Sequence, residues 1–256
     1  MKFRFASFAL STALLFAGVA QAQTNVSPNL GSTAGSFTTD RYNPATWGLV
    51  NGYQGRNDVL QIGINSSTDA VNRGGLSATF YNTQGKKLAV NTTGSWLFQS
   101  DVFVEAAWAQ TARNCLSACI RTDMWATSTD DVVFASPSAY PIIGVTNYGT
   151  TGLRARGYDV NSGLWLDFSN TLNMNAWNTL GMGWDSGSNT FSYFVNGAFA
   201  GSVVGTYANT GVANVMYQAY NFNDPALQIA GNSAYDVRWS NTPGTVVPEP
   251  STYALM

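Results

Sequence analysis

Residues 177–204 decide the fold class, and they read WNTLGMGWDSGSNTFSYFVNGAFAGSVV. In the first run of this segment the large apolar residues alternate with others, so they share one face of a strand: Leu180, Met182 and Trp184. Residues 185–189 then turn the chain into an aromatic run, which ends at Asn196-Gly197. Asn-Gly is the dipeptide best suited to a two-residue hairpin, because both positions tolerate positive φ. The segment therefore predicts an antiparallel β-meander with one buried face.

Short alternating or aromatic-rich runs, separated by Gly, Asn and Asp, continue on both sides of this segment. The predicted strands are residues 59–65, 77–81, 86–90, 96–107, 121–126, 141–147, 153–158, 164–168, 177–184, 190–195, 198–203, 212–220, 227–229 and 235–239. Helical periodicity is hard to find, and this strand spacing is typical of a sandwich or barrel rather than of βαβ units. We expect an all-β chain in which two antiparallel sheets form a β-sandwich, as one domain at residues 41–241.

The late strands of this domain resemble a known family. The order Ala-Trp-Asn-Thr-Leu, apolar strand, Asp turn, aromatic strand and Val-Asn-Gly at residues 176–197 resembles concanavalin A-like and laminin-G-like jelly rolls. The run AYDVRWS at residues 234–240 resembles their final strand. The resemblance in sequence pattern covers residues 177–240. The first half of the domain resembles the family only in its number of predicted strands. It implies a concanavalin A-like jelly roll whose working surface is the concave face of one sheet, where such domains usually hold glycans.

The first 22 residues, 1–22, have the pattern of a secretory signal peptide. Lys2 and Arg4 precede an apolar run that closes on Ala20-Gln21-Ala22, an A-x-A cleavage site that makes Gln23 the mature N-terminus. The run is shorter than the ~20 residues of a membrane span, which argues against an anchor. Residues 23–40 are rich in Ser, Thr, Asn and Gly, and we expect either a lead-in strand or a loose tail.

Residues 242–256 contain a linker and the run VPEPST. Pro248 and Pro250 bracket Glu249, and two prolines so close fit neither a helix interior nor a sheet interior. The run closely resembles the PEP-CTERM sorting signal, in which the tripeptide precedes a transmembrane helix and an Arg-rich cluster. The resemblance implies export across the inner membrane of a Gram-negative, exopolysaccharide-making bacterium, and processing by an exosortase. Because the sequence stops six residues past Pro250, we expect the helix, and with it a transient membrane contact, to be missing.

Composition excludes several function classes. The chain has 12 Lys and Arg against 14 Asp and Glu, and it has no His. Without Lys2 and Arg4 the exported chain carries 10 basic and 14 acidic residues, a net charge of −4, with no basic patch for nucleic acid. The lack of histidine excludes a Ser-His-Asp triad and a His-ligated zinc. With 45% hydrophobic and 13% aromatic residues, the chain is expected to fold rather than to be disordered.

Two predicted strands each carry basic and aromatic residues on one face. The candidate ligand-binding residues are Arg121, Asp123 and Trp125 on the first strand and Arg154, Arg156 and Tyr158 on the second. Aromatic rings suit the C–H faces of sugars and polar groups suit their hydroxyls, so the two strips predict a groove for an acidic polysaccharide. The alternative is a pair of solvent-facing ladders, in which cross-strand Arg–Asp pairs contribute less than about 1 kcal/mol each.

An enzyme that cuts glycosidic bonds generally needs two carboxylates, about 5 to 9 Å apart. The chain has only two glutamates, Glu105 and Glu249, and the second lies in the sorting signal. Many jelly-roll glucanases take their carboxylates from a Glu-x-Asp-x-Glu strand, but Phe103 occupies the alternate position before Glu105. The glucanase motif is therefore absent.

Two other catalytic arrangements stay open. One is a lyase built on Tyr158 and Arg156, and the other is a hydrolase that uses Asp123 with Asp130 or Asp131. Neither forms a constellation that stands out from the scattered aspartates of the chain. We therefore expect a protein that is not an enzyme.

The cysteines, Cys115 and Cys119, are too few to complete a tetrahedral zinc site without His. In an exported protein a small-loop disulfide is the better interpretation, unless the two thiols point apart. We expect no cofactor. A structural Ca²⁺ has weak candidates at Asp130-Asp131 and Asn223-Asp224, although turn chemistry explains the same residues.

The sequence as a whole predicts an exported, exosortase-sorted protein of the cell surface, outer membrane or extracellular matrix. Its jelly roll is expected to bind or organise exopolysaccharide without catalysis. The first alternative is a purely structural surface protein without a specific ligand. The second is a polysaccharide-cleaving hydrolase or lyase with an atypical Asp or Tyr/Arg site.

Overall fold

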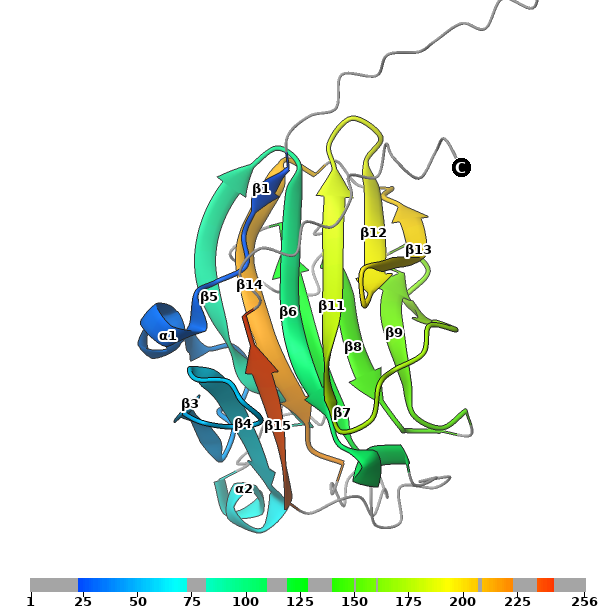
Figure 1. Ribbon diagram of the computed structural model, residues 1–256. Coiled ribbons are helices and arrows are strands. Elements are labelled where there is room, and N and C mark those ends of the chain that lie inside the picture. The colour runs from blue at the N-terminus through cyan, green and yellow to red at the C-terminus, as the bar shows by residue number, and fades with distance from the viewer. Residues whose placement is uncertain are drawn as a thin grey trace, which may run out of the picture.

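The computed structural model describes residues 23–72, 82–109, 119–128, 140–149, 151–159, 161–206, 209–222 and 234–241. Within them, two sheets stack face to face, with long strands that run roughly side by side (Figure 1). This arrangement confirms the predicted all-β fold, a two-sheet jelly-roll sandwich. We refer to the sheets as sheet A and sheet B.

Sheet A contains the segment that decides the fold. Its strands lie in the order β13 (Ala198–Val204), β12 (Thr190–Val195), β11 (Ala176–Asp185), β6 (Trp96–Val104), β15 (Ala234–Ser240), β4 (Val59–Asn65) and β3 (Thr46–Val50). The β12–β13 hairpin turns at Asn196 and Gly197, both with positive φ, as the Asn-Gly dipeptide predicts. The short strand β1 (Thr24–Asn25) adds to β6 in parallel, and the other strand pairs of this sheet are antiparallel among the described residues.

Sheet B is antiparallel throughout its described strands. Their order is β10 (Leu164–Asp167), β9 (Arg154–Asp159), β8 (Ile142–Thr146), β7 (Arg121–Thr127), β14 (Gly211–Tyr220), β5 (Thr83–Thr93) and β2 (Thr38–Thr39). The two strands that carry the basic and aromatic strips, β7 and β9, are therefore separated by β8 alone. Their separation across the sheet is about 10 Å, twice the spacing of neighbouring strands.

Some element boundaries differ from the sequence prediction. Strand β6 ends at Val104 rather than Ala107, because the chain enters a 3₁₀ helix, Ala106–Ala109, in which the amide of Trp108 donates to the carbonyl of Glu105. Strand β5 is longer than the predicted 86–90, and the edge strand β3 has no predicted counterpart. A short helix, α2 (Ser66–Asn72), follows β4. The predicted strands at 77–81 and 227–229 lie outside the described residues.

The lead-in segment at residues 23–40 belongs to the sandwich. Strand β1 pairs with β6, and β2 pairs with β5 at the edge of sheet B. Between them lies a short helix, α1 (Leu30–Thr33), whose Asn29 side chain accepts a hydrogen bond from the Ser32 amide. Leu30 is buried in the core. The alternative of a loose tail is therefore wrong, and the folded unit begins before residue 41.

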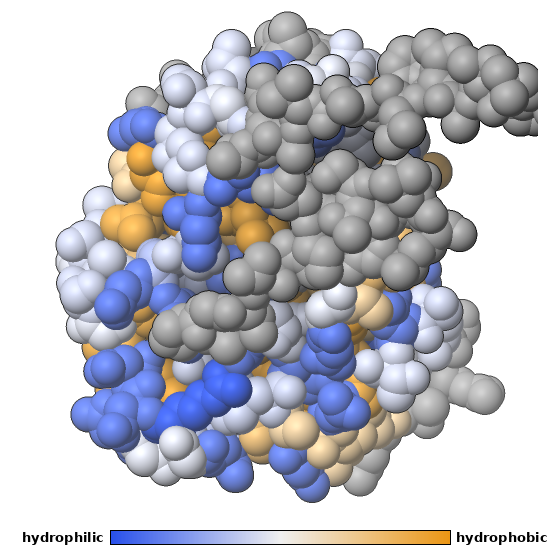
Figure 2. Space-filling model, turned by 45° about the horizontal axis from the view of Figure 1, so that its top comes forward, coloured by the Kyte–Doolittle hydropathy of each residue, from blue (hydrophilic) through white to orange (hydrophobic). Residues whose placement is uncertain are grey.

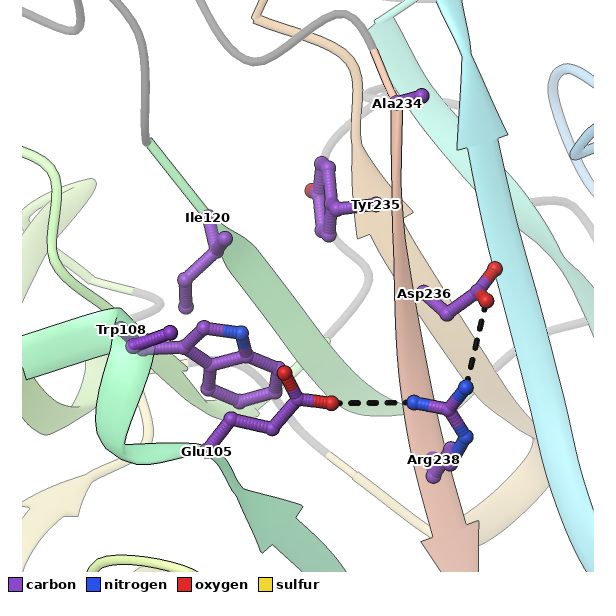
Figure 3. Close-up of a pocket in the computed structure, with 8 residues that line it drawn as sticks. Glu105, Trp108, Ile120, Ala234, Tyr235, Asp236 and Arg238 are labelled. Atoms are coloured by element: carbon purple, nitrogen blue, oxygen red, sulfur yellow. Dashed lines mark hydrogen bonds and ion pairs between the residues drawn. The ribbon is translucent and has the colours of Figure 1, made fainter.

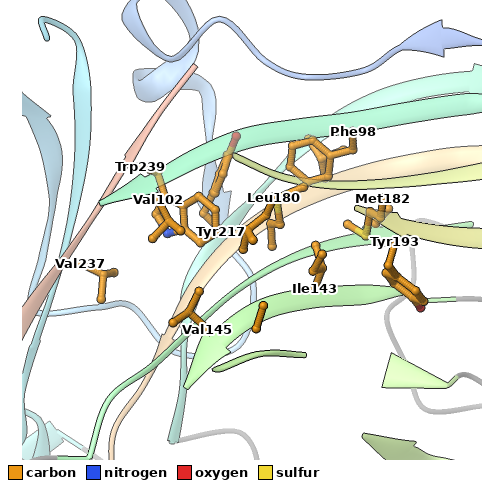
Figure 4. Close-up of a cluster of buried hydrophobic side chains, with 14 of the residues drawn as sticks. Phe98, Val102, Ile143, Val145, Leu180, Met182, Tyr193, Tyr217, Val237 and Trp239 are labelled. Atoms are coloured by element: carbon orange, nitrogen blue, oxygen red, sulfur yellow. The ribbon is translucent and has the colours of Figure 1, made fainter. Parts of the chain in front are cut away.

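The core lies between the inner faces of the two sheets. Figure 4 shows side chains of both sheets meeting there, among them Leu180 and Met182 of β11 and Tyr217 of β14. The predicted buried face of residues 177–184 is thus confirmed. Polar atoms also join the sheets through this core: Trp239 Nε1 donates to Thr122 Oγ1 over 2.9 Å.

The outer face of sheet A carries a loop, residues 51–58, that is fastened by side chains. Arg56 forms an ion pair with the buried Asp101 (2.5 Å), and its guanidinium lies 4.4 Å from the ring centroid of Trp177. The indole N–H of Trp177 donates to the carbonyl of Gln54. Figure 2 shows hydrophilic side chains interspersed with small apolar patches on the face turned to the viewer. No helix within the described residues is long and apolar enough to span a membrane.

Candidate functional site

The register of sheet B brings the two predicted strips onto one outer face. Asp123 of β7 pairs with Gly144 of β8, and Gly144 pairs with Arg156 of β9. Met124 and Ala155, which alternate with these residues, belong to the core instead. Strand alternation therefore places both strips on the face of sheet B that points away from the core, although Asp123, Trp125 and Arg156 are buried there.

A pocket of about 170 Å³ lies on this face, which we call the sheet B pocket. It is lined by Arg41, Thr83, Arg121, Trp125, Tyr140, Ile142, Tyr158, Trp165 and Tyr220. Three of the predicted residues, Arg121, Trp125 and Tyr158, are thus brought together.

Aromatic rings form a continuous row along one side of the pocket. Trp125 stacks on Tyr140 with ring centroids 6.3 Å apart, and Tyr140 stacks on Tyr158 at 5.6 Å. Tyr158 in turn meets Trp165 of β10 edge-on at 5.1 Å. Such a row presents flat apolar faces of the kind on which sugar rings lie.

Guanidinium groups lie over these rings. Arg156 is 3.6 Å and Arg121 is 4.7 Å from the ring centroid of Trp165. Arg121 also lies 4.9 Å from the ring of Tyr220 at the other side of the pocket. Arg41 lies 4.6 Å from the ring of Trp125. The pocket lining therefore combines aromatic faces with two cations, and Arg156, which is buried and does not line the pocket, adds a third against the ring of Trp165.

Two carboxylates pair with these guanidiniums, and a third, Asp167, lies opposite Arg156 in the register of β9 and β10 and acts on its charge. Asp123 holds Arg121 through a contact of 2.5 Å between Asp123 Oδ2 and Arg121 Nε, and Asp40 forms an ion pair with Arg41 at 3.2 Å. Among the described residues, no carboxylate lies within ion-pair distance of the Arg156 guanidinium. The predicted Asp123 is buried, and it does not line the pocket but orients Arg121 from below. Among the described residues here, four arginines stand against three carboxylates, Asp40, Asp123 and Asp167, and this local excess of positive charge favours an anion.

Burial shifts the pKa values of the groups at this site. Burial, assisted by the nearby charge of Arg121, lowers the pKa of Arg156 to about 9. Burial raises the pKa of Tyr158 to about 12, and its hydrogen bond with Tyr140 acts in the same direction. Burial also raises the pKa of Asp40 against the opposing effect of Arg41. At neutral pH Tyr158 is therefore a phenol that can donate a hydrogen bond.

Several buried polar atoms beside the pocket lack a hydrogen-bond partner within the described part of the chain. They are the donors Trp125 Nε1 and Arg156 Nε and the acceptors Asp123 Oδ1 and Gln218 Oε1. Buried polar groups normally find a partner, so water or ligand hydroxyls would suit these positions. The other end of the Gln218 side chain is occupied, since its Nε2 donates to Asp40 Oδ2 over 3.1 Å.

One predicted residue, Arg154, lies apart from the pocket. Its guanidinium pairs with Asp167 at 2.6 Å and donates to the carbonyls of Tyr148 and Gly152. Sequence reasoning missed six pocket residues: Arg41, Thr83, Tyr140, Ile142, Trp165 and Tyr220. Trp165 could have been found, because it stands in a predicted strand next to the one that carries Tyr158.

Several predicted sites cannot be placed, since Cys115, Asp130, Asp131, Asn223 and Asp224 lie outside the described residues. The sequence stretches 1–22 and 242–256, with Ala20, Ala22, Pro248, Glu249 and Pro250, also lie outside them. Cys119 is disulfide-bonded. Within the described ranges no three His, Cys, Asp or Glu side chains gather as a metal site would require.

A second pocket, of about 400 Å³, lies where β6 ends and β15 begins (Figure 3). Arg238 lies between two carboxylates there, 3.1 Å from Glu105 and 3.3 Å from Asp236. Glu105, whose sequence context lacks the glucanase motif, is thus engaged in an ion pair. Among the described lining residues the two carboxylates outnumber the one arginine, which differs from the sheet B pocket.

Comparison with known proteins gives similarity of fold. No family model matches the chain, and no curated protein does either. The chain is similar to a sialidase structure at 9% identity and a TM-score of 0.44, and the match covers 80% of this chain and only 16% of that one. A Bacillus licheniformis beta-glucanase matches at 13% identity and a TM-score of 0.36, over 80% of this chain and 98% of that one. The alginate lyase Aly36B matches at 10% identity and a TM-score of 0.48, over 80% and 95%.

Proposed function

We propose that this chain is an exported, exosortase-sorted protein of the cell surface or extracellular matrix, and that its sheet B pocket binds acidic exopolysaccharide without cleaving it. The signal-peptide pattern and the PEP-CTERM-like run support the destination. The pocket supports the ligand class. In this proposal the aromatic row receives sugar rings, and the arginines neutralise the carboxylates of the polymer.

One observation carries the proposal: the guanidiniums of Arg121 and Arg156 both lie over the ring of Trp165. Among the described residues, Asp123 forms an ion pair with Arg121 and not with Arg156. Two cations held close together repel each other, and their mutual repulsion is one cause of the lowered pKa of Arg156. An anion that binds between them relieves that repulsion. A neutral polymer offers no such gain, so the site should discriminate in favour of polyuronates.

The test is a binding measurement on the full chain with a panel of polyuronates and uncharged glucans. We expect binding to the polyuronates, and we expect Arg121→Ala, Trp125→Ala and Arg156→Ala each to weaken it at least about tenfold, or 1.4 kcal/mol. Arg56→Ala is the matched control, since it removes an arginine stacked on tryptophan from sheet A. A folded wild type that binds no polymer in the panel would favour the purely structural role.

Cleavage is the competing function, and the neighbourhood of Tyr158 and Arg156 is the observation that favours it. A lyase would need a base at the pocket, whereas the raised pKa of Tyr158 keeps that residue protonated at neutral pH. The hydrolase alternative is disfavoured at Asp123, whose carboxylate is buried and ion-paired. Monitoring the same mixtures for new reducing or unsaturated ends tests both, and their appearance would overturn the non-catalytic proposal.

A further inference from the structure

Tyr235 belongs to sheet A, yet its hydroxyl reaches the backbone of sheet B. The residue lies near the start of β15, and its ring projects from that strand (Figure 3). Its hydroxyl oxygen lies 3.0 Å from the carbonyl oxygen of Arg121 and 2.5 Å from that of Tyr220. The same oxygen accepts from the amides of Tyr220 (3.1 Å) and Arg121 (3.4 Å). One side chain therefore bonds two residues of two different strands.

The hydroxyl takes the place of a step in the strand ladder. Strands β7 and β14 pair in register from Thr127 and Asn214 as far as Thr122 and Ala219. The next two residues, Arg121 and Tyr220, are the ones that Tyr235 joins. A hydroxyl between two backbones holds them further apart than a direct amide–carbonyl bond would. Burial raises the pKa of Tyr235, so the hydroxyl keeps its proton and can donate as well as accept.

The two joined residues are neighbours in the sheet B pocket. Both line it, and the Arg121 guanidinium lies 4.9 Å from the ring of Tyr220. We propose that Tyr235 is a positioning residue of this pocket, which holds Arg121 in place beside Tyr220 from the opposite sheet. This inference rests on the proposed function, because it assigns Tyr235 a role in binding the acidic polymer.

A double-mutant cycle tests the inference on the full chain, with sodium polygalacturonate as the probe. We expect Tyr235→Phe and Arg121→Ala each to weaken binding about tenfold. The double variant should bind like Arg121→Ala within about twofold, because Tyr235 acts through Arg121. Tyr217→Phe is the matched control: it removes another buried tyrosine hydroxyl, which faces Ser100, and it should bind like the wild type.

Amide hydrogen exchange without any ligand provides the second arm. In Tyr235→Phe the amides of Arg121 and Tyr220 lose their acceptor, so they should exchange at least about tenfold faster than in Tyr217→Phe. The inference would be overturned if the binding losses of Tyr235→Phe and Arg121→Ala added up in the double variant, or if Tyr235→Phe bound the polymer as tightly as the wild type does. If Tyr235→Phe does not fold, amide exchange in the wild type tests the inference instead. Fast exchange of both amides would refute the hydrogen bonds from Arg121 and Tyr220 to the Tyr235 hydroxyl, and slow exchange would support them.

The two arms separate failure of this inference from failure of the proposed function. A wild type that binds neither polygalacturonate nor any other polyuronate refutes the proposed function. The exchange measurement still tests the hydrogen bonds of the Tyr235 hydroxyl in that case, because it needs no ligand. Unchanged amide exchange in Tyr235→Phe would refute these hydrogen bonds, and faster exchange at Arg121 and Tyr220 would support them.

Discussion

Gly144→Ala is expected to destabilise the protein by about 3 kcal/mol or more, as measured by urea unfolding. Gly144 lies in β8 directly opposite Asp123 of β7. A Cβ atom at this position would overlap Asp123 Oδ1 and the carbonyl oxygen of Thr122, and it would lie 2.9 Å from Asp123 Cα. Two of these three atoms belong to the backbone, so the clash cannot be relieved by a rotamer change. The strand pair would have to separate beneath the sheet B pocket.

Gly48→Ala is the matched control for this prediction. Gly48 also lies within a strand, β3, but nothing among the described residues stands within 4 Å of the Cβ position there. Because alanine restricts the unfolded chain more than glycine does, this variant should be neutral or more stable by up to about 1 kcal/mol. Equal stability of Gly144→Ala and Gly48→Ala would show that β7 and β8 do not approach as closely as described.

Trp165→Ala is expected to weaken polyuronate binding at least about 30-fold, or 2 kcal/mol, in the same binding assay. The ring of Trp165 contacts Tyr158 and carries the guanidiniums of both Arg121 and Arg156. Its removal ends the aromatic row and frees two cations to adopt other rotamers. The loss should exceed that of any single arginine substitution, because all three contacts disappear together.

Trp177→Ala controls for the loss of an indole ring as such. Trp177 is also half-buried and also carries an arginine, Arg56, but it lies on the outer face of sheet A. We expect this variant to bind polyuronates like the wild type. If Trp177→Ala weakened binding as much as Trp165→Ala, the ligand would not be confined to sheet B.

Local patterns predicted the sheets because each pattern needs only neighbours in sequence. Alternation is enforced by the pleat, so the faces of Trp125 and Arg156 could be assigned without knowing the strand order. The turn at Asn196-Gly197 requires positive φ at both residues, and Asn and Gly are the residue types that adopt positive φ most readily. The same locality explains why residues 121–126 and 190–195 were placed within a residue of their observed ends.

The rest of the site depends on contacts between distant segments, which such patterns do not contain. Arg41 comes from the start of the predicted domain and reaches Trp125, far later in the chain. Tyr220 enters the pocket only because β14 lies between β7 and β5. Conversely, Arg154 fits the alternation pattern but is drawn to Asp167 on the edge strand β10. Strand order and ion pairing decide these positions.

The position of β15 sets the order in which the sandwich can be completed. This strand, the last one described, lies between β4 and β6 in sheet A, so two early strands are joined through a late one. A chain that emerges from a ribosome or an export channel N-terminus first would hold β3 and β4 apart from β6 until residues 234–240 arrive. Contacts of such long sequence separation make folding slow. The sandwich would therefore be completed only after β15 has joined β4 to β6.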